Sequence, residues 1–328
     1  MSATDTESGT EGPSSAPAVA GAALEIPLSG PAGEPVDLRR LVASHGFVEL
    51  PPMRRDAVAH ALEVTLPVPG ARPRTVRIEP GRPGHARVVV RGPRPGAGAR
   101  AHLLVAVRHV LGMDEDLSGF YALAARDPAL AWAAAGAGRM IRSPTVFEDV
   151  VKTICTTNCA WSATERMVGA IVAHLGEPAV GAPAEGPAGR AFPTPQAMAA
   201  VGEDFYRLQA RAGYRGAYLL ALARGAAEGA FDLEALGGAT PEELPDDELV
   251  RRLLVLPGVG PYAAAHVMMM LGRHSRLILD SWTRPTYARI AGRRSVPDAA
   301  IRRRFRRYGR WAGLAFWLIC TRDWVEEG

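Results

Sequence analysis

Alternating hydrophobic and polar residues mark three short stretches in the first third of the chain. The alternation is partial over 61–68 and clean over 75–79, and a valine-rich run follows over 86–91. A period of two places every second side chain on the same face of a β-strand. Proline–glycine pairs near these stretches indicate turns. We therefore predict an antiparallel sheet in the N-terminal part of the chain.

After Gly98 the apolar residues recur at the i, i+3, i+4 spacing of helices, and alanine, the best helix former, is abundant. A Gly/Ala/Pro-rich loop interrupts this pattern at 177–190. The expected helices cover 101–111, 117–126, 128–137, 146–175, 195–201, 205–210, 214–228, 246–254, 261–271 and 282–291. The fold class is therefore α+β, with an N-terminal antiparallel β-sheet domain and a mostly α-helical body.

Three segments follow from these patterns. Residues 1–22 are rich in Ser, Thr, Gly, Ala and acids and lack periodicity, so we expect a disordered tail. A β-rich domain over 23–112 and an α-helical domain over 113–328 should follow. The N-terminus has no basic stretch leading into an apolar one, and no run of about 18 apolar residues occurs. These features favour a cytoplasmic protein that does not bind membranes.

The basic residues are unusual in kind. The 328 residues include 38 Lys and Arg against 34 Asp and Glu, and Lys152 is the only lysine. Arginine binds phosphate well through its planar, always-charged fork, but the excess of Arg, Ala, Gly and Pro also fits codon composition. The three cysteines, Cys155, Cys159 and Cys320, form neither a disulfide framework nor a four-thiolate set. We expect no iron–sulfur cluster and no required cofactor.

A glycine-rich turn lies between two predicted helices, at Leu256-Pro257-Gly258-Val259-Gly260. Gly258 and Gly260 permit positive φ and close backbone approach, and Pro261 suits the first position of the next helix. The free N–H groups of that helix could hold a phosphate without reading sequence. A plain corner between two helices is the alternative interpretation.

Asp280 follows a short apolar run and precedes a helical pattern, 20 residues past Gly260. One interpretation is an ordinary N-cap, worth about 1 kcal/mol. The other is a reactive carboxylate, which could stabilise an oxocarbenium-like centre and orient or deprotonate an attacking water. Pro285 is awkward in a first turn, so the helix should begin late or bend there.

Five segments in order resemble the helix-hairpin-helix (HhH-GPD) DNA glycosylase superfamily, in the branch of the 8-oxoguanine and alkylpurine (3-methyladenine) glycosylases. They are Asp149-Val-Val-Lys-Thr-Ile-Cys-Thr-Thr-Asn158, Phe192-Pro-Thr-Pro-Gln-Ala-Met-Ala199, Gly213-Tyr-Arg-Gly-Ala-Tyr218, the 256–260 turn and Asp280. The likeness covers about residues 100–325. It implies a base-excision-repair enzyme that acts on double-stranded DNA with a damaged base, as a nucleoid-associated monomer.

The resemblance also implies roles for single residues. Asn158 would lie at the gap left by a flipped nucleotide, Tyr214 would wedge beside the opposite base, and Arg215 would contact the orphaned base. Gly258, Val259 and Gly260 would contact DNA phosphate. The backbone carbonyls expected to hold a Na⁺ or K⁺ ion are those of Leu254, Leu256 and Val259.

The departures from the family pattern are informative. Tyr262 stands where bifunctional members carry the Schiff-base lysine, and Lys152 lies elsewhere, where we expect a surface or phosphate contact. Ala163 and Phe316 stand near where 8-oxoguanine glycosylases carry an arginine and a glutamine. We therefore expect a monofunctional enzyme in which Asp280 and water cleave the bond.

Aromatic residues are candidates to replace the missing pocket groups. Electron-rich rings favour cationic bases such as N-alkylated purines. We expect two or three rings to face the pocket, with Trp317 more typical of the core, and take Tyr262, Trp161, Trp282 and Phe316 as the pocket residues. A non-catalytic protein that senses DNA damage or structure is the alternative function, and a lyase that uses another amine is the third.

Overall fold

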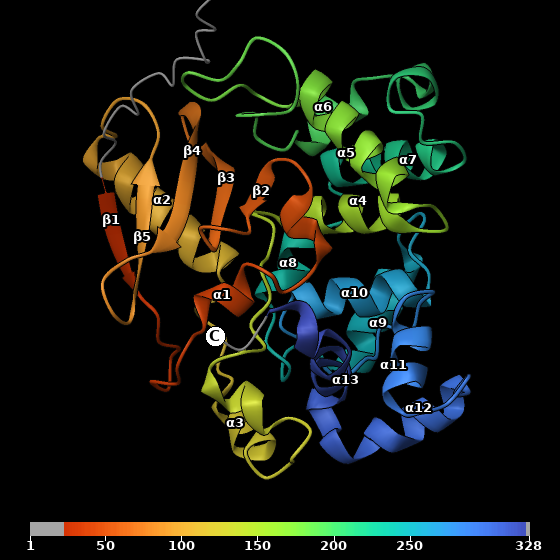
Figure 1. Cartoon of the computed structure of the whole chain (residues 1–328). Helices are drawn as coiled ribbons and strands as arrows, with labels where there is room; N and C mark the ends of the chain where they lie inside the picture. Colours follow the sequence, from red (N-terminus) through yellow and green to blue (C-terminus); the bar gives the residue numbers. More distant parts are fainter. Residues whose placement is uncertain (1–22, 326–328) are drawn as a thin grey trace, which may run out of the picture.

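The computed structural model describes residues 23–325, so the expected tail at 1–22 lies outside the described residues. The predicted α+β fold is confirmed (Figure 1). Five antiparallel strands form one sheet in the order β1-β5-β4-β3-β2. Their bounds are β1 (Ala23–Pro27), β2 (Met53–Asp56), β3 (Ala61–Val68), β4 (Ala71–Pro80) and β5 (His85–Val90).

The alternation of the strands places one row of apolar side chains on a single face of the sheet. Val64, Val76 and Val90 stand opposite one another across β3, β4 and β5, and all three are fully buried. They belong to the same core as Leu103 and Val107 of helix α2 (Ala97–Val110). The sheet is therefore stabilised by burial of this face against α2.

The rest of the described chain is mainly helical. Its helices are α1 (Leu38–Leu41), α3 (Ser118–Ala124), α4 (Val146–Thr156), α5 (Trp161–Leu175), α6 (Pro195–Ala199), α7 (Arg215–Ala227), α8 (Leu233–Gly238), α9 (Asp246–Val255), α10 (Pro261–Met270), α11 (Thr283–Ile290), α12 (Asp298–Phe305) and α13 (Ala312–Thr321). None of the helices in this part of the chain is both long and apolar enough to cross a membrane.

Helix α10 is apolar on all sides because it lies between two cores. Val267 and Met268 pack into a core formed with α4, α5, α7 and α9. Met269 and Met270 pack into a second core formed with α3, α12 and α13. Every residue of α10 from Ala263 onward is buried. A helix that is hydrophobic all round is expected at such a central position.

The sequence pattern was wrong about one long helix. The segment 146–175 forms two helices, α4 and α5, separated at 157–160. Asn158 adopts a positive φ of 46°, which no helix interior allows, and the Thr157 hydroxyl donates to the Ile154 carbonyl at the end of α4. The pattern also missed the short helices α1, α8 and α12, and the segment 128–137 contains only a 3₁₀ turn at Ala131–Ala135.

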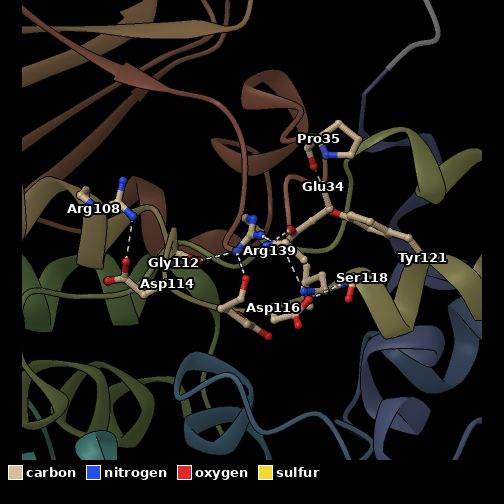
Figure 2. Close-up of polar contacts among 12 residues, drawn as sticks. Glu34, Pro35, Arg108, Gly112, Asp114, Asp116, Ser118, Tyr121 and Arg139 are labelled. Atoms are coloured by element: carbon tan, nitrogen blue, oxygen red, sulfur yellow. Dashed lines mark hydrogen bonds and ion pairs between the residues drawn. The ribbon is translucent and has the colours of Figure 1, made fainter.

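A buried arginine joins the loop after β1 to the segment between α2 and α3 (Figure 2). Arg139 donates to the carbonyls of Gly112 and Glu115, both at 2.6 Å, and to the Glu34 carboxylate at 2.5 Å. The same Glu34 oxygen accepts from the Leu117 backbone N–H at 3.1 Å. A buried charge pair persists only with such additional hydrogen bonds, and here they fix the N-terminal loop to the helical body.

Candidate active site

A cleft of about 1260 Å³ opens between the helical body and a loop of the sheet domain. Its wall combines the turn after α1, the junction between α4 and α5, the start of α7, the α9–α10 turn, the segment before α11, and α13. The lining residues are His45, Gly46, Phe47, Thr156, Thr157, Asn158, Cys159, Trp161, Thr164, Tyr214, Tyr218, Leu254, Leu256, Gly258, Val259, Gly260, Pro261, Tyr262, Ala263, His266, Leu279, Asp280, Ser281, Trp282, Arg284, Trp317 and Trp324.

The predicted hairpin lies on this cleft between α9 and α10. Gly258 has a φ of +78°, and a Cβ added there would lie 2.9 Å from the Tyr218 side chain. Both facts require glycine at this position. The first helical hydrogen bond of α10 runs from Ala264 N–H to Gly260 O, and no side chain caps the helix. The preceding N–H groups of Tyr262 and Ala263 are therefore donors without an intrahelical acceptor.

Asp280 lies on the same cleft, and its carboxylate is held in place by the backbone that follows. Its Oδ1 accepts hydrogen bonds from the N–H groups of Trp282 and Thr283, at 2.8 and 2.6 Å. Its own N–H donates to the Thr283 hydroxyl. Both bonds to the carboxylate go to Oδ1. The capping interpretation is thus correct in its geometry, and the cap leaves Oδ2 without a hydrogen bond among the described residues.

Helix α11 starts at Thr283, before Pro285 rather than after it. The hydrogen bonds on either side of Pro285 run from Arg284 N–H to Asp280 O and from Thr286 N–H to Trp282 O, so the proline leaves out the bond to Ser281 O that would lie between them. It therefore costs one hydrogen bond in the first turn but does not delay the start of α11.

Two of the three residues expected to interact with the base gap stand at the mouth of the cleft. Asn158 is exposed and its amide donates to the Tyr214 hydroxyl at 3.4 Å. Tyr214 is 55% exposed. The third, Arg215, is buried, and its guanidinium donates to the Thr157 carbonyl at 2.9 Å and stacks over Tyr214. The predicted contact of Arg215 with an orphaned base is therefore wrong in this geometry. Arg215 instead supports the 157–158 turn.

Three of the four predicted pocket rings line the cleft. Trp161 and Trp282 are 40% and 38% exposed, and the Tyr262 hydroxyl hydrogen-bonds to the Thr156 hydroxyl at 3.2 Å. Phe316 was wrongly predicted to face the pocket. It is fully buried and packs edge-on against Phe305, with ring centroids 5.1 Å apart.

The next residue of α13 takes the place expected of Phe316. One step along a helix turns the side chain by about 100°, so Trp317 faces the cleft when Phe316 faces the core. The ring of Trp317 lies 5.9 Å from that of Trp282, and its indole N–H donates to the Ser44 carbonyl at 2.9 Å. Trp324 extends the same aromatic group, 5.2 Å from Trp282.

The sequence patterns missed the contribution of the sheet domain to the cleft. His45, Gly46 and Phe47 form a 3₁₀ turn and its cap after α1. A Cβ on Gly46 would lie 2.9 Å from the Trp161 ring, so Gly46 permits the two walls to meet. Residues on a short irregular turn carry no periodicity, which is why this segment gave no signal.

His266 was missed as well, although a histidine inside the apolar α10 pattern is a visible signal. Its ring stacks on Phe47 with centroids 4.7 Å apart and planes 11° apart, and it meets the edge of Tyr262. Burial lowers the pKa of His266 to about 4. Burial also lowers the pKa of His45 to about 3, and that ring hydrogen-bonds to the Ile141 carbonyl. Both imidazoles are therefore neutral at neutral pH.

The single lysine is not on the surface, which corrects the prediction for Lys152. Its side chain is fully buried and pairs with Glu148, Nζ to Oε1 2.6 Å. The neighbouring Asp149 carboxyl is also buried, and this burial raises its pKa to about 7. Lys152 is not among the residues that line the cleft. It is a structural residue of α4 rather than a nucleophile or a phosphate contact.

The carbonyls expected to hold a monovalent cation belong to Leu254 in the last turn of α9 and to Leu256 and Val259 in the turn that follows. Leu254, Leu256 and Val259 all line the cleft, and the Leu256 carbonyl accepts from the Val259 N–H at 3.1 Å. Terminal helix carbonyls lack intrahelical partners and carry the negative end of the helix dipole. No group of three or more acidic, His or Cys side chains within 23–325 is arranged to hold a metal ion. Binding of Na⁺ or K⁺ at these carbonyls stays a prediction, and their neutral oxygens suit a monovalent ion better than a divalent one.

The fold of this chain is similar to that of several solved DNA glycosylase structures, whereas its sequence has no such match. No protein-family model and no curated protein matches the sequence. Among solved structures, MBOgg1 in complex with a low-affinity DNA ligand is 15% identical at a TM-score of 0.70, covering 93% of this chain and 96% of that one. The 3-methyladenine DNA glycosylase of Archaeoglobus fulgidus is 19% identical at a TM-score of 0.67, covering 93% and 100%.

The 8-oxoguanine glycosylase/lyase of Clostridium acetobutylicum, in complex with double-stranded DNA containing cytosine opposite 8-oxoguanine, is 17% identical at a TM-score of 0.64. The match covers 85% of this chain and 92% of that one. At identities this low the likeness concerns the fold. The chain therefore has the α+β fold that these DNA glycosylases share over nearly its whole length.

Proposed function

We propose that this chain is a base-excision-repair DNA glycosylase, which flips an alkylated purine out of duplex DNA and hydrolyses its N-glycosidic bond with water. The observation that carries the proposal is the position of Asp280. Its carboxylate is anchored through Oδ1 on a cleft that also contains the phosphate-binding type of hairpin at 256–260. A damaged nucleotide held by that hairpin would bring its sugar to the carboxylate.

The chemistry follows from that carboxylate. When the bond between the base nitrogen and C1′ breaks, its electron pair leaves with the base and C1′ becomes an oxocarbenium-like centre. The negative charge of Asp280 stabilises this centre. A water molecule then attacks C1′ and its proton passes to the carboxylate. The products are the free base and an abasic site.

The position of the single lysine favours hydrolysis over Schiff-base chemistry by a lysine side chain. Tyr262 stands on the cleft at the position of the lysine in bifunctional enzymes, and its hydroxyl is engaged by Thr156. The only lysine of the chain, Lys152, is buried against Glu148. No lysine of this chain can therefore attack C1′, and we propose a monofunctional glycosylase.

The aromatic lining supports cationic purines as substrates. Trp161, Trp282, Trp317 and Tyr262 all line the cleft. Their ring faces attract a positively charged base by cation–π interaction, at about 0.5–2 kcal/mol for each good contact. Alkylation at a ring nitrogen gives a purine this charge and also makes it a better leaving group.

The remaining residues at the mouth of the cleft would bind the DNA backbone and fill the gap left by the flipped nucleotide. The free N–H groups at the start of α10 would bind a phosphate, with Na⁺ or K⁺ bridging from the α9 carbonyls. Asn158 and Tyr214 project at the mouth and would fill the gap that the flipped nucleotide leaves. The Arg215 contact with Thr157 would hold both residues in place.

A panel of duplexes with alkylated, oxidised or deaminated bases tests the proposal. We expect release of alkylated purines, strand scission only after hot alkali, and no adduct trapped by borohydride. Binding to DNA without release of any base would favour the alternative, a non-catalytic sensor of damage or DNA structure. A borohydride-trapped adduct would instead indicate a lyase that uses another amine.

A further inference from the structure

The ring of His266 has hydrogen-bonding capacity that the described protein does not use. It is 7% exposed and lines the cleft, and its Nδ1 and Nε2 are both shielded from solvent without a hydrogen-bond partner among the described residues, so the ring must rotate for either nitrogen to meet a ligand. Most buried polar groups are paired, and an unpaired one at a functional cleft calls for an explanation. By contrast the adjacent His45 uses both ring nitrogens, toward Ile141 O and Phe47 N–H.

The surroundings of the ring point to a planar ligand. Phe47 stacks on His266, while Tyr262 and Trp317 meet it at steep angles, with centroids 5.8 and 6.5 Å away. These rings give the cleft beside His266 an apolar aromatic lining against which a planar base can pack. In such surroundings a hydrogen bond to an imidazole nitrogen is stronger than in water, so a base that offers one is favoured.

We propose that His266 is the base-reading residue of this cleft, turning a ring nitrogen toward the edge of the flipped purine. The inference rests on the proposed function. A neutral imidazole has one donor and one acceptor nitrogen, and the tautomer is normally fixed by a partner on the other nitrogen. No described residue fixes it here. His266 can therefore accept from the amino group of an adenine-derived lesion or donate to the oxygen of a guanine-derived one.

Neutrality of the ring also matters for a cationic base. An imidazolium would repel an N-alkylated purine and offer two donors with no acceptor. The burial that keeps His266 uncharged removes this conflict. The same residue thus accommodates alkylated adenine and alkylated guanine, and the substrate class we infer contains both.

The test measures binding to uncleaved lesions. Duplexes would carry a 2′-fluoro nucleotide of 7-methylguanine or 3-methyladenine, whose fluorine slows bond cleavage, or a tetrahydrofuran abasic analogue. His266→Phe keeps the stacked ring and removes both nitrogens, and His266→Asn restores a neutral donor and acceptor. His102→Phe, on α2 and outside the cleft, is the matched control. Thermal unfolding of each variant checks the fold.

We expect His266→Phe to weaken binding of both lesions about tenfold, which corresponds to about 1.4 kcal/mol, and to leave abasic-site binding unchanged. His266→Asn should recover most of this loss, and His102→Phe should lose nothing. In ¹⁵N spectra of the wild-type complexes, the imidazole should accept a hydrogen bond from the adenine lesion and donate one to the guanine lesion.

Two outcomes would overturn the inference, and they differ. If the wild type releases alkylated purines and His266→Phe binds both uncleaved lesions within twofold of wild type, His266 does not read the base although the proposed function stands. If the wild type releases no base from either lesion, the proposed function and the reading by His266 fail together.

Discussion

Replacement of Asp280 by asparagine separates the two roles of this side chain. Asparagine caps helices as well as aspartate does, so its Oδ1 can keep the bonds to Trp282 and Thr283 N–H, now 2.8 and 2.6 Å. The folded state should be preserved, with a change of about 0.5 kcal/mol or less in the free energy of unfolding. Only the negative charge beside the reacting sugar is lost.

The expected loss of rate follows from that charge. Asp280 is half-buried, so an effective dielectric constant of about 20 applies, and unit charges about 4 Å apart then interact by about 4 kcal/mol. Loss of this stabilisation in the transition state slows base release about a thousandfold. Asp280→Ala should be slowed as much and should also lose about 1 kcal/mol of stability with the cap.

Single-turnover release of an alkylated purine, with enzyme in excess over labelled duplex, measures the chemical step. Urea unfolding of each variant measures stability, and binding to a duplex with an abasic analogue shows that the DNA interface is intact. If Asp280→Asn binds DNA and still releases the base at the wild-type rate, Asp280 is only a helix cap and the proposed mechanism is wrong.

Three further predictions concern the buried residues. Phe316→Ala should cost about 3–5 kcal/mol of stability without changing the ratio of excision rates between two lesions, because its ring lies in the core. Trp317→Ala should change that ratio, because its ring lines the cleft. A changed ratio in the Phe316 variant would show that this ring faces the pocket instead. Lys152→Met should destabilise by about 3–5 kcal/mol because Glu148 is left buried and unpaired, and a loss below 1 kcal/mol in urea unfolding would contradict this burial. Burial lowers the pKa of His266 to about 4, so as the pH falls below 6.5 the unfolded state binds a proton before the folded state does, and this group costs roughly 3 kcal/mol of stability between pH 7 and 4. His266→Phe should therefore lose less stability over this range than wild type. Equal pH dependence of the free energy of unfolding in the two proteins would refute the lowered pKa.

The spacing of apolar residues predicted the strands and helices whose burial follows a regular pattern along the chain. The strands around Val64 and Val76 alternate because one face of the sheet is buried, and α10 is apolar throughout because it lies between two cores. The break of the long helix at Asn158 depends on a backbone conformation with positive φ, which apolar spacing does not record.

The site was predictable where its residues lie on recognisable turns, and not elsewhere. The hairpin glycines and Asp280 stand beside helix ends and line one cleft. Phe316 and Trp317 are neighbours on an apolar helix, so composition alone could not decide which one faces the cleft. Arg215 had the expected position but a buried guanidinium, because its partner Thr157 belongs to a helix end that the sequence pattern did not show.

Through the turn at His45, Gly46 and Phe47, two separate parts of the chain build one cleft. The carboxylate and the hairpin come from the helical body, but part of the floor on which a base would lie comes from the sheet domain. Under the proposed function, substitutions in that turn would change which base fits without touching Asp280 or the hairpin. Exchanging the first 112 residues between proteins of this fold should therefore shift substrate preference only in part, because Trp161, Tyr262, His266, Trp282 and Trp317 stay with the helical body, and it requires that the Glu34 contact with Arg139 is kept.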